Sequence, residues 1–178
     1  MHGELEQAGD RWTLRFTRPL PHPPERVWRA ITEAEHLEAW FPQRVSGEWA
    51  VGAPLRFTDP GTDHPAFAGE VLACEPPRLL EYRWGTDVLR FEIVPDGSGC
   101  TLVLLDTIDE LGKAARDGAG WHACLDVLGH HLNGSQPPWT PREHWGDVHP
   151  EYLKRFGPEA STIGPPQGAD ATTEGGGG

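Results

Sequence analysis

The sequence has few cysteines, and none is spaced to form a disulfide framework or a zinc knuckle. The chain contains Cys74, Cys100 and Cys124, and no Cys-x-x-Cys pair occurs. An odd number of widely spaced thiols predicts neither structural cross-links nor a cysteine-bound metal. Residues 1–10 are polar and acidic, and they lack the apolar core of a signal peptide. This combination favours a protein of the reducing cytoplasm.

Long apolar runs and an excess of positive charge are also missing. No stretch of about 18 apolar residues is present, so the sequence predicts no membrane-spanning helix. The formal net charge is −12. A chain this acidic repels both phosphate backbones and anionic lipid head groups. We therefore expect neither nucleic acid nor a membrane surface as a partner.

The common motifs of nucleotide binding and hydrolysis are absent as well. Neither a P-loop nor a Gly-x-Gly-x-x-Gly loop occurs, and neither a Gly-x-Ser-x-Gly elbow nor a His-Glu-x-x-His pair is present. His130 and His131 are adjacent, so on a helix they point about 100° apart and cannot bind one ion together. The sequence therefore predicts no cofactor and no metal site.

Aromatic residues, by contrast, are plentiful, with 8 Trp, 6 Phe and 2 Tyr among 178 residues. A chain of this length can bury a sizeable core. The alternation of residues 12–17 predicts a half-buried strand. Pro24 can take the first position of a helix, and Thr32-x-x-Glu35 is a capping-box pattern that predicts a second helix ending before Pro42.

A series of short strands and one long helix are predicted next. Turn signals separate strand-like runs at 45–49, 53–57, 66–75, 78–84, 87–94 and 100–108, which is typical of an antiparallel meander. Arg83 and Arg90 are expected to point away from its buried face. Trp121, Leu125, Leu128 and Leu132 then form a helical stripe that stops at Asn133-Gly134.

The chain is expected to divide into four parts. Residues 1–10 are predicted to be a polar leader and residues 11–134 a single domain. Residues 135–156, rich in proline and aromatic residues, are expected to pack on that domain with one short helix near 151–156. Residues 157–178 have no apolar periodicity and are predicted to be a flexible tail.

Three motifs in this order carry a family resemblance. They are HPPERVWRAITEAEHLEAWFP at 22–42, GEV followed by EPPRLLEYRW at 69–84, and GW followed by LDVLGHHLNG at 120–134. Together they resemble the START-like or SRPBCC superfamily, in the branch named for the activator of heat-shock-protein-90 ATPase homologue. The resemblance covers about residues 12–134. It implies an α+β helix-grip (Bet v-like) fold, in which a curved antiparallel sheet wraps a long C-terminal helix.

Closing a curved sheet on one helix leaves space between them, so we expect an apolar cavity there. Each aromatic residue taken alone is better explained by core packing, but the group supports a cavity. The predicted lining is Trp40, Phe41, Phe57, Phe67, Tyr82, Trp84, Leu89, Phe91, Leu102, Leu104, Trp121, Leu125 and Leu128.

Two polar groups are candidates for chemistry. Asp106 continues the inward alternation of its strand, so it could face the cavity with a raised pKa. The favoured alternative is that the strand has reached the rim of the sheet and Asp106 is solvated, because burying an unpaired carboxylate is costly. His122 and Asp126 are four residues apart on the helix. They could form a weak ligand pair or a general-base pair, but an ordinary surface ion pair is favoured. Cys74 and Cys124 are interpreted as small buried hydrophobes, and His144 as polar surface.

Three functions remain open, in this order of preference. The first is binding of a small apolar or aromatic molecule. The second is an enzyme of the cyclase or hydrolase kind, with Asp106 and His122 as candidate catalytic residues. The third is a co-chaperone-like regulator of a heat-shock-protein ATPase, for which the partner would be a chaperone; self-association is also open. The resemblance alone does not choose among them, because a fold does not fix a function.

Overall fold

A curved antiparallel sheet is the main element of the computed structural model, which describes residues 1–165. Within these residues the sheet has eight strands in the order β1-β2-β8-β7-β6-β5-β4-β3. The consecutive pairing from β3 to β8 is the predicted meander. The strands are β1 (Glu4–Ala8), β2 (Arg11–Leu20), β3 (Arg44–Gly47), β4 (Pro54–Thr58), β5 (Phe67–Glu75), β6 (Leu79–Trp84), β7 (Asp87–Asp96) and β8 (Gly99–Ile108).

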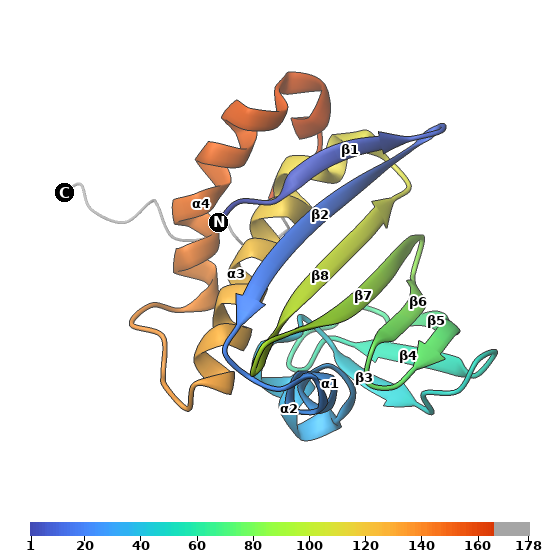
Figure 1. Cartoon of the computed structure of the whole chain (residues 1–178). Helices are drawn as coiled ribbons and strands as arrows, with labels where there is room; N and C mark the ends of the chain where they lie inside the picture. Colours follow the sequence, from blue (N-terminus) through green and yellow to red (C-terminus); the bar gives the residue numbers. More distant parts are fainter. Residues whose placement is uncertain (166–178) are drawn as a thin grey trace.

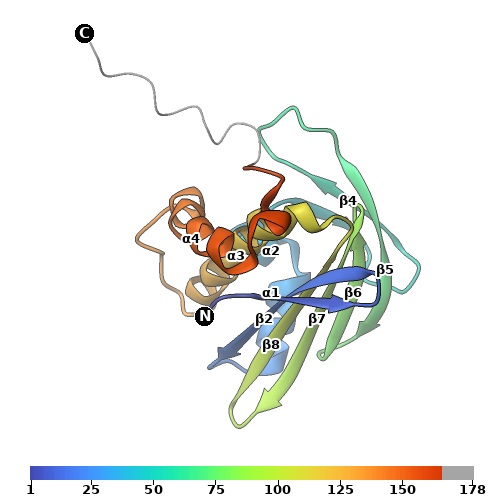
Figure 2. The ribbon, with the colours of Figure 1, turned by 90° about the horizontal axis from the view of Figure 1, so that it is seen from above.

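The helices lie at one end and on one side of this sheet. Two short helices, α1 (Pro24–Thr32) and α2 (Ala34–Trp40), connect β2 to β3. After β8, a 3-10 turn (Leu111–Lys113) leads into the long helix α3 (Ala114–Leu132), followed by α4 (Pro141–Phe156). The sheet curves around α3, and α4 packs on the side of α3 that faces away from the sheet (Figure 1, Figure 2). This arrangement confirms the predicted α+β helix-grip fold.

Strand alternation determines which side chains face α3. Tyr82, Leu89, Asp106 and Leu14 are register partners across β6, β7, β8 and β2, and all four are fully buried. On the other face, Arg90 binds the carboxylates of its neighbours Glu81 and Glu92. The outward orientation predicted for Arg83 and Arg90 is therefore confirmed, with Arg83 exposed.

The sequence correctly predicts where α1 begins and where α3 ends, but the capping box predicted at Thr32 is wrong. As predicted, α1 begins at Pro24, and α3 ends at Leu132 with Gly134 in the left-handed conformation. The capping box expected at Thr32 does not form. Thr32 ends α1, and its hydroxyl donates to the carbonyl of Trp28 (2.7 Å). The same signature does form at Thr140 and Glu143, where it begins α4.

Residues 4–8 and 141–161 form more regular structure than the sequence predicts. Residues 4–8 form β1 instead of a polar leader, and α4 is longer than the helix expected near 151–156. Within the predicted tail, residues 158–161 form a 3-10 turn, and Ile163 N–H donates to the carbonyl of Gly112 (3.1 Å). The remainder of that tail, 166–178, lies outside the described residues. No helix within residues 1–165 is both long and apolar enough to cross a membrane.

Candidate functional site

Most of the predicted cavity lining packs together in the core. Tyr82, for example, stacks between Phe57 and Phe91, with ring centroids 6.0 and 6.1 Å apart. An enclosed apolar cavity between sheet and helix is thus not confirmed and stays a prediction. The predicted lining residues that belong to the buried core are Trp40, Phe41, Phe57, Tyr82, Leu89, Phe91, Leu102, Leu104, Trp121, Leu125 and Leu128.

An open pocket lies where the ends of β6 and α2 meet the first half of α3. It has a volume of about 360 Å³ and a mostly apolar wall, and three indole rings border it. We call it the indole pocket. A second pocket of similar size adjoins it and is bordered by another predicted residue, Phe67. The indole pocket is lined by Pro42, Gln43, Trp84, Arg116, Asp117, Gly120, Trp121, Cys124 and Trp145.

Each of the three indoles is held in place by a hydrogen bond from its N–H group. Trp84 donates to the side chain of Gln43 (3.0 Å), and Trp145 donates to the carbonyl of Arg116 (3.1 Å). Trp121 donates to Asp106 (2.8 Å). Because the N–H groups are engaged, the rings present apolar faces to the pocket. The rings of Trp84 and Trp121 also contact each other, with centroids 5.2 Å apart.

Asp106 lies behind Trp121 and is completely buried. The favoured expectation of a solvated carboxylate at the rim is therefore wrong, because β8 continues beneath α3 past this position. One carboxylate oxygen accepts the Trp121 hydrogen bond, and the other has no partner among the described residues; the hydroxyl of Tyr82 has none either. Burial, with the negative charge of Asp87 as a second cause, raises the pKa of Asp106 well above its ordinary value.

A charged network lies close to this acid, and a carboxylate oxygen of Asp87 lies within 4.8 Å of one of Asp106. Lys113 Nζ lies 2.9 Å from both oxygens of Asp87 and 2.6 Å from Asp109. Burial raises the pKa of Asp87, although its bonds from Lys113 oppose the shift. Asp87 and Lys113 both border the pocket that adjoins the indole pocket.

His122 belongs to a second cluster, on the side of α3 that faces α4. Its Nε2 lies 3.2 Å from Asp126, and Nε2 of His144 on α4 lies 2.7 Å from the same carboxylate oxygen. Burial alone would raise the pKa of Asp126, but bonds from the two imidazoles and the charge of Arg18 lower it to about 2. The expectation of a surface ion pair is wrong, because α4 covers His122 and leaves 7% of its side chain exposed.

The structure does not bring the two catalytic candidates together. Asp106 contacts Trp121 on the sheet side of α3, whereas His122 contacts Asp126 and Tyr152 on the α4 side. Successive residues of a helix point about 100° apart, so neighbours such as Trp121 and His122 serve different surfaces. The two groups therefore cannot act on one small substrate in this arrangement.

The cysteines Cys74 and Cys124 carry no activated thiol. Cys124 borders the indole pocket, and burial raises its pKa to about 12. Burial also raises the pKa of Cys74. A thiol with a raised pKa is a poor nucleophile at neutral pH. Both side chains pack against the core as small apolar groups, but they are partly exposed and not buried as interpreted from the sequence.

Several site residues were missed by the sequence analysis. Gln43, Arg116 and Asp117 are polar residues next to recognised motifs, and no spacing marks them as pocket residues. Trp145 and His144 stand in the segment 135–156, which was expected to pack on the domain but with a helix only near 151–156, so neither residue was placed at a site. The signal that could have placed them is the capping box at Thr140, which predicts that the following residues form a helix with regular faces.

Comparison with solved structures gives the same fold. A conserved protein of unknown function from Enterococcus faecalis is 19% identical, covering 86% of this chain and 90% of its own, with a TM-score of 0.71. CalU16 from Micromonospora echinospora is 22% identical, covering 87% and 94%, with a TM-score of 0.67. The protein encoded by gene BPP1335 from Bordetella parapertussis is 29% identical, covering 86% and 92%, with a TM-score of 0.65.

No curated protein matches the chain. A family does match, over residues 21–133, which include α1 to α3 and all but the first two strands. This segment is more than half of the 178 residues and contains nearly all of the three motifs noted in the sequence. The chain belongs to the family of activator of Hsp90 ATPase homolog 1-like proteins.

Proposed function

We propose that this chain binds a small, flat, apolar or aromatic molecule in the indole pocket. The observation that carries the proposal is the set of three indole rings around an open, mostly apolar space of about 360 Å³. That volume lies within the usual range of small-molecule sites, which are apolar with a few placed polar groups. Here those polar groups are Gln43, Arg116 and Asp117 at the pocket wall.

The pocket wall is already ordered, which favours binding. Because its indoles are fixed by hydrogen bonds to Gln43, Arg116 and Asp106, little side-chain freedom would be lost when a ligand stacks on them. Arg116 is itself held by Asp117, with 2.7 Å between Nε and the carboxylate. A planar ligand with one polar edge would match the ring faces and this ion pair together.

The two other functions have weaker support. A catalytic role for Asp106 would require substrate contact, but this carboxyl group is completely buried and does not border the pocket. A co-chaperone needs a continuous apolar docking face. Among the described residues, the large apolar side chains that are exposed are Met1, Val51, Val94 and Leu153, which lie on separate segments of the chain.

Two glycines of α3 provide a matched test of the pocket. A side-chain carbon added at Gly120 or at Gly129 would meet no neighbouring atom within 4 Å, and Gly120 alone of the two borders the pocket. Gly120→Leu therefore fills the pocket, whereas Gly129→Leu adds the same side chain on the same helix elsewhere. Replacing glycine by leucine favours a helix in both cases, by up to about 1 kcal/mol.

The experiment measures binding of the fluorescent aromatic probe anilinonaphthalene sulfonate, together with native mass spectrometry of freshly purified protein. We expect the probe to bind the wild type and Gly129→Leu alike, and Gly120→Leu at least roughly tenfold more weakly, a loss of about 1.4 kcal/mol. Equal probe affinity in all three proteins, with no copurified small molecule on the wild type, would overturn the proposal.

A further inference from the structure

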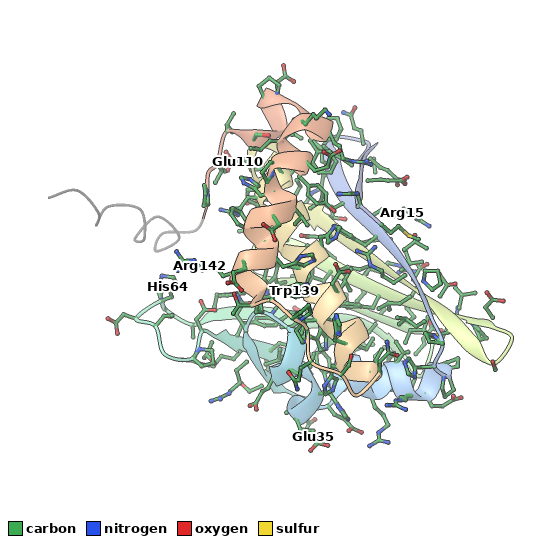
Figure 3. The ribbon with its side chains drawn as sticks, turned by 90° about the vertical axis from the view of Figure 1, so that its left-hand side faces the viewer. Arg15, Glu35, His64, Glu110, Trp139 and Arg142 are labelled. Carbon is green, nitrogen blue, oxygen red and sulfur yellow. The ribbon has the colours of Figure 1, made fainter. Side chains whose placement is uncertain are left out.

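Three side chains of types that can ligate a metal converge between α3 and α4, away from the indole pocket. His122 and Asp126 are one helical turn apart on α3, and His144 lies in the first turns of α4. Each offers one ligand atom, and the three atoms all lie within 4.8 Å of one another. Figure 3 looks onto α4 and labels Trp139, which precedes this helix and stacks on His144.

The three atoms are close enough together for one small divalent ion to join them. Around tetrahedral Zn²⁺, with metal–nitrogen bonds of about 2.0–2.1 Å, neighbouring ligand atoms lie about 3.3 Å apart. Asp126 Oδ2 is 3.2 Å from Nε2 of His122 and 2.7 Å from Nε2 of His144. A shift of roughly half an ångström in the His144 side chain would open the second distance to the same value.

Both imidazoles contact groups outside the cluster, and His122 has a hydrogen-bonding partner at its second ring nitrogen, as metal-binding histidines usually have. The Nδ1 of His122 lies 3.0 Å from the hydroxyl of Tyr152, which is buried and accepts a hydrogen bond from Gly3 N–H (2.7 Å). The His144 ring stacks on Trp139, with centroids 4.0 Å apart. These contacts leave Nε2 of each ring directed at Asp126.

The charge of the cluster is set by Asp126 and Arg18. Asp126 is the carboxylate that both imidazoles share, and Arg18 Nη2 lies 3.7 Å from its other oxygen, Oδ1. The positive charge of Arg18 weakens the attraction of Asp126 for a metal ion, but Arg18 contacts Oδ1, whereas the two imidazoles contact Oδ2. The side chain of Asp126 is 31% exposed, so an ion can reach the cluster from solvent.

We propose that His122, Asp126 and His144 form a binding site for a divalent transition-metal ion, with Zn²⁺ as the ion that this donor set fits best. Two nitrogens and one carboxylate oxygen leave a fourth position for water or a small anion. Because the ligands come from both helices, the ion joins α4 to α3. Hard cations such as Mg²⁺ prefer oxygen ligands and are not expected to bind here.

The test uses the full chain, without an affinity tag and freed of metal, titrated with Zn²⁺ by calorimetry. We expect one equivalent to bind, Mg²⁺ to give no heat, and the melting temperature to rise with Zn²⁺. Asp126→Asn and His144→Ala should each weaken binding by at least roughly tenfold. The matched control is His36→Ala, which removes a histidine from the more exposed cluster of Glu33, Glu35 and His36 and should leave Zn²⁺ affinity unchanged.

Absence of stoichiometric binding, unchanged affinity in Asp126→Asn and His144→Ala, or loss of binding in His36→Ala would overturn the proposal. Circular dichroism shows whether each variant is folded. The visible spectrum of wild-type protein loaded with Co²⁺ tests for a tetrahedral site without the use of any variant. A strong tetrahedral absorption supports the site, and the spectrum of the hydrated ion counts against it.

Discussion

Replacing Asp106 with asparagine should change how stability depends on pH. In the folded chain, burial raises the pKa of Asp106 well above its ordinary value of 3.8, so the native state holds a proton that the unfolded chain releases. Between the ordinary and the raised pKa, the free energy of unfolding therefore falls as pH rises, by about 1.4 kcal/mol per pH unit. Below the ordinary pKa this contribution to stability is fully present.

Asp106→Asn removes this titration and keeps an oxygen that accepts the Trp121 hydrogen bond. The variant should be less sensitive to pH than the wild type, and at neutral pH it should be the more stable protein. Asp106→Leu should show the same reduced sensitivity, but with a free energy of unfolding about 1–3 kcal/mol lower than that of Asp106→Asn, because the buried indole N–H loses its acceptor.

Urea unfolding followed by tryptophan fluorescence, repeated between about pH 4 and pH 8, measures both effects. The quantity to compare is the difference between the wild-type and variant free energies at each pH, because contributions from distant groups cancel in it. If this difference is constant across the range, Asp106 titrates alike in the folded and unfolded chains. The account of a buried, protonated carboxyl group would then be wrong.

Two further predictions concern the helices. A side-chain carbon at Gly118 would lie 2.9 Å from the Tyr152 ring, whereas one at Gly129 would meet no neighbouring atom within 4 Å. Gly118→Ala should therefore lower the melting temperature, and Gly129→Ala should raise it, because alanine favours a helix over glycine by up to about 1 kcal/mol. Equal shifts of the two variants in a thermal melt would contradict this. Thr140→Ala removes the N-terminal cap of α4 and should lower the free energy of unfolding by about 1 kcal/mol, as measured by urea unfolding. The control is Thr62→Ala in an exposed loop, which should change the free energy of unfolding little.

The fold was predictable because its signals are local and repeated. Alternation in β6, β7 and β8 set the buried face, and the stripe from Trp121 to Leu132 set the face of α3 that meets it. Local signals failed where a distant partner decides the structure. Residues 4–8 have the composition of a polar leader, but they form a strand because β2 pairs with them. The capping box predicted at Thr32 does not form because Thr32 is the last residue of α1.

The environments of Asp106 and His122 could not be predicted for the same reason. The cost of burying an unpaired carboxylate argued for a solvated Asp106, but the Trp121 hydrogen bond and a raised pKa reduce that cost. His122 looked like half of a surface ion pair because no local pattern indicates that α4 covers it. Both errors concern contacts between segments that are not adjacent in sequence.

Helix α4 contributes one residue to the indole pocket and the adjacent residue to the cluster of His122, Asp126 and His144. Residues 141–156 lie beyond the segment 21–133 that matches the family, yet Trp145 forms a wall of the indole pocket and the adjacent His144 joins Asp126. The adjacent residues His144 and Trp145 thus contact two different surfaces of α3. A ligand that holds α4 in place through His144 would therefore also hold Trp145 in the pocket wall. If a metal ion at His144 raises the affinity of the pocket for the probe, the probe must raise the affinity for Zn²⁺ by the same factor, because linked equilibria are reciprocal.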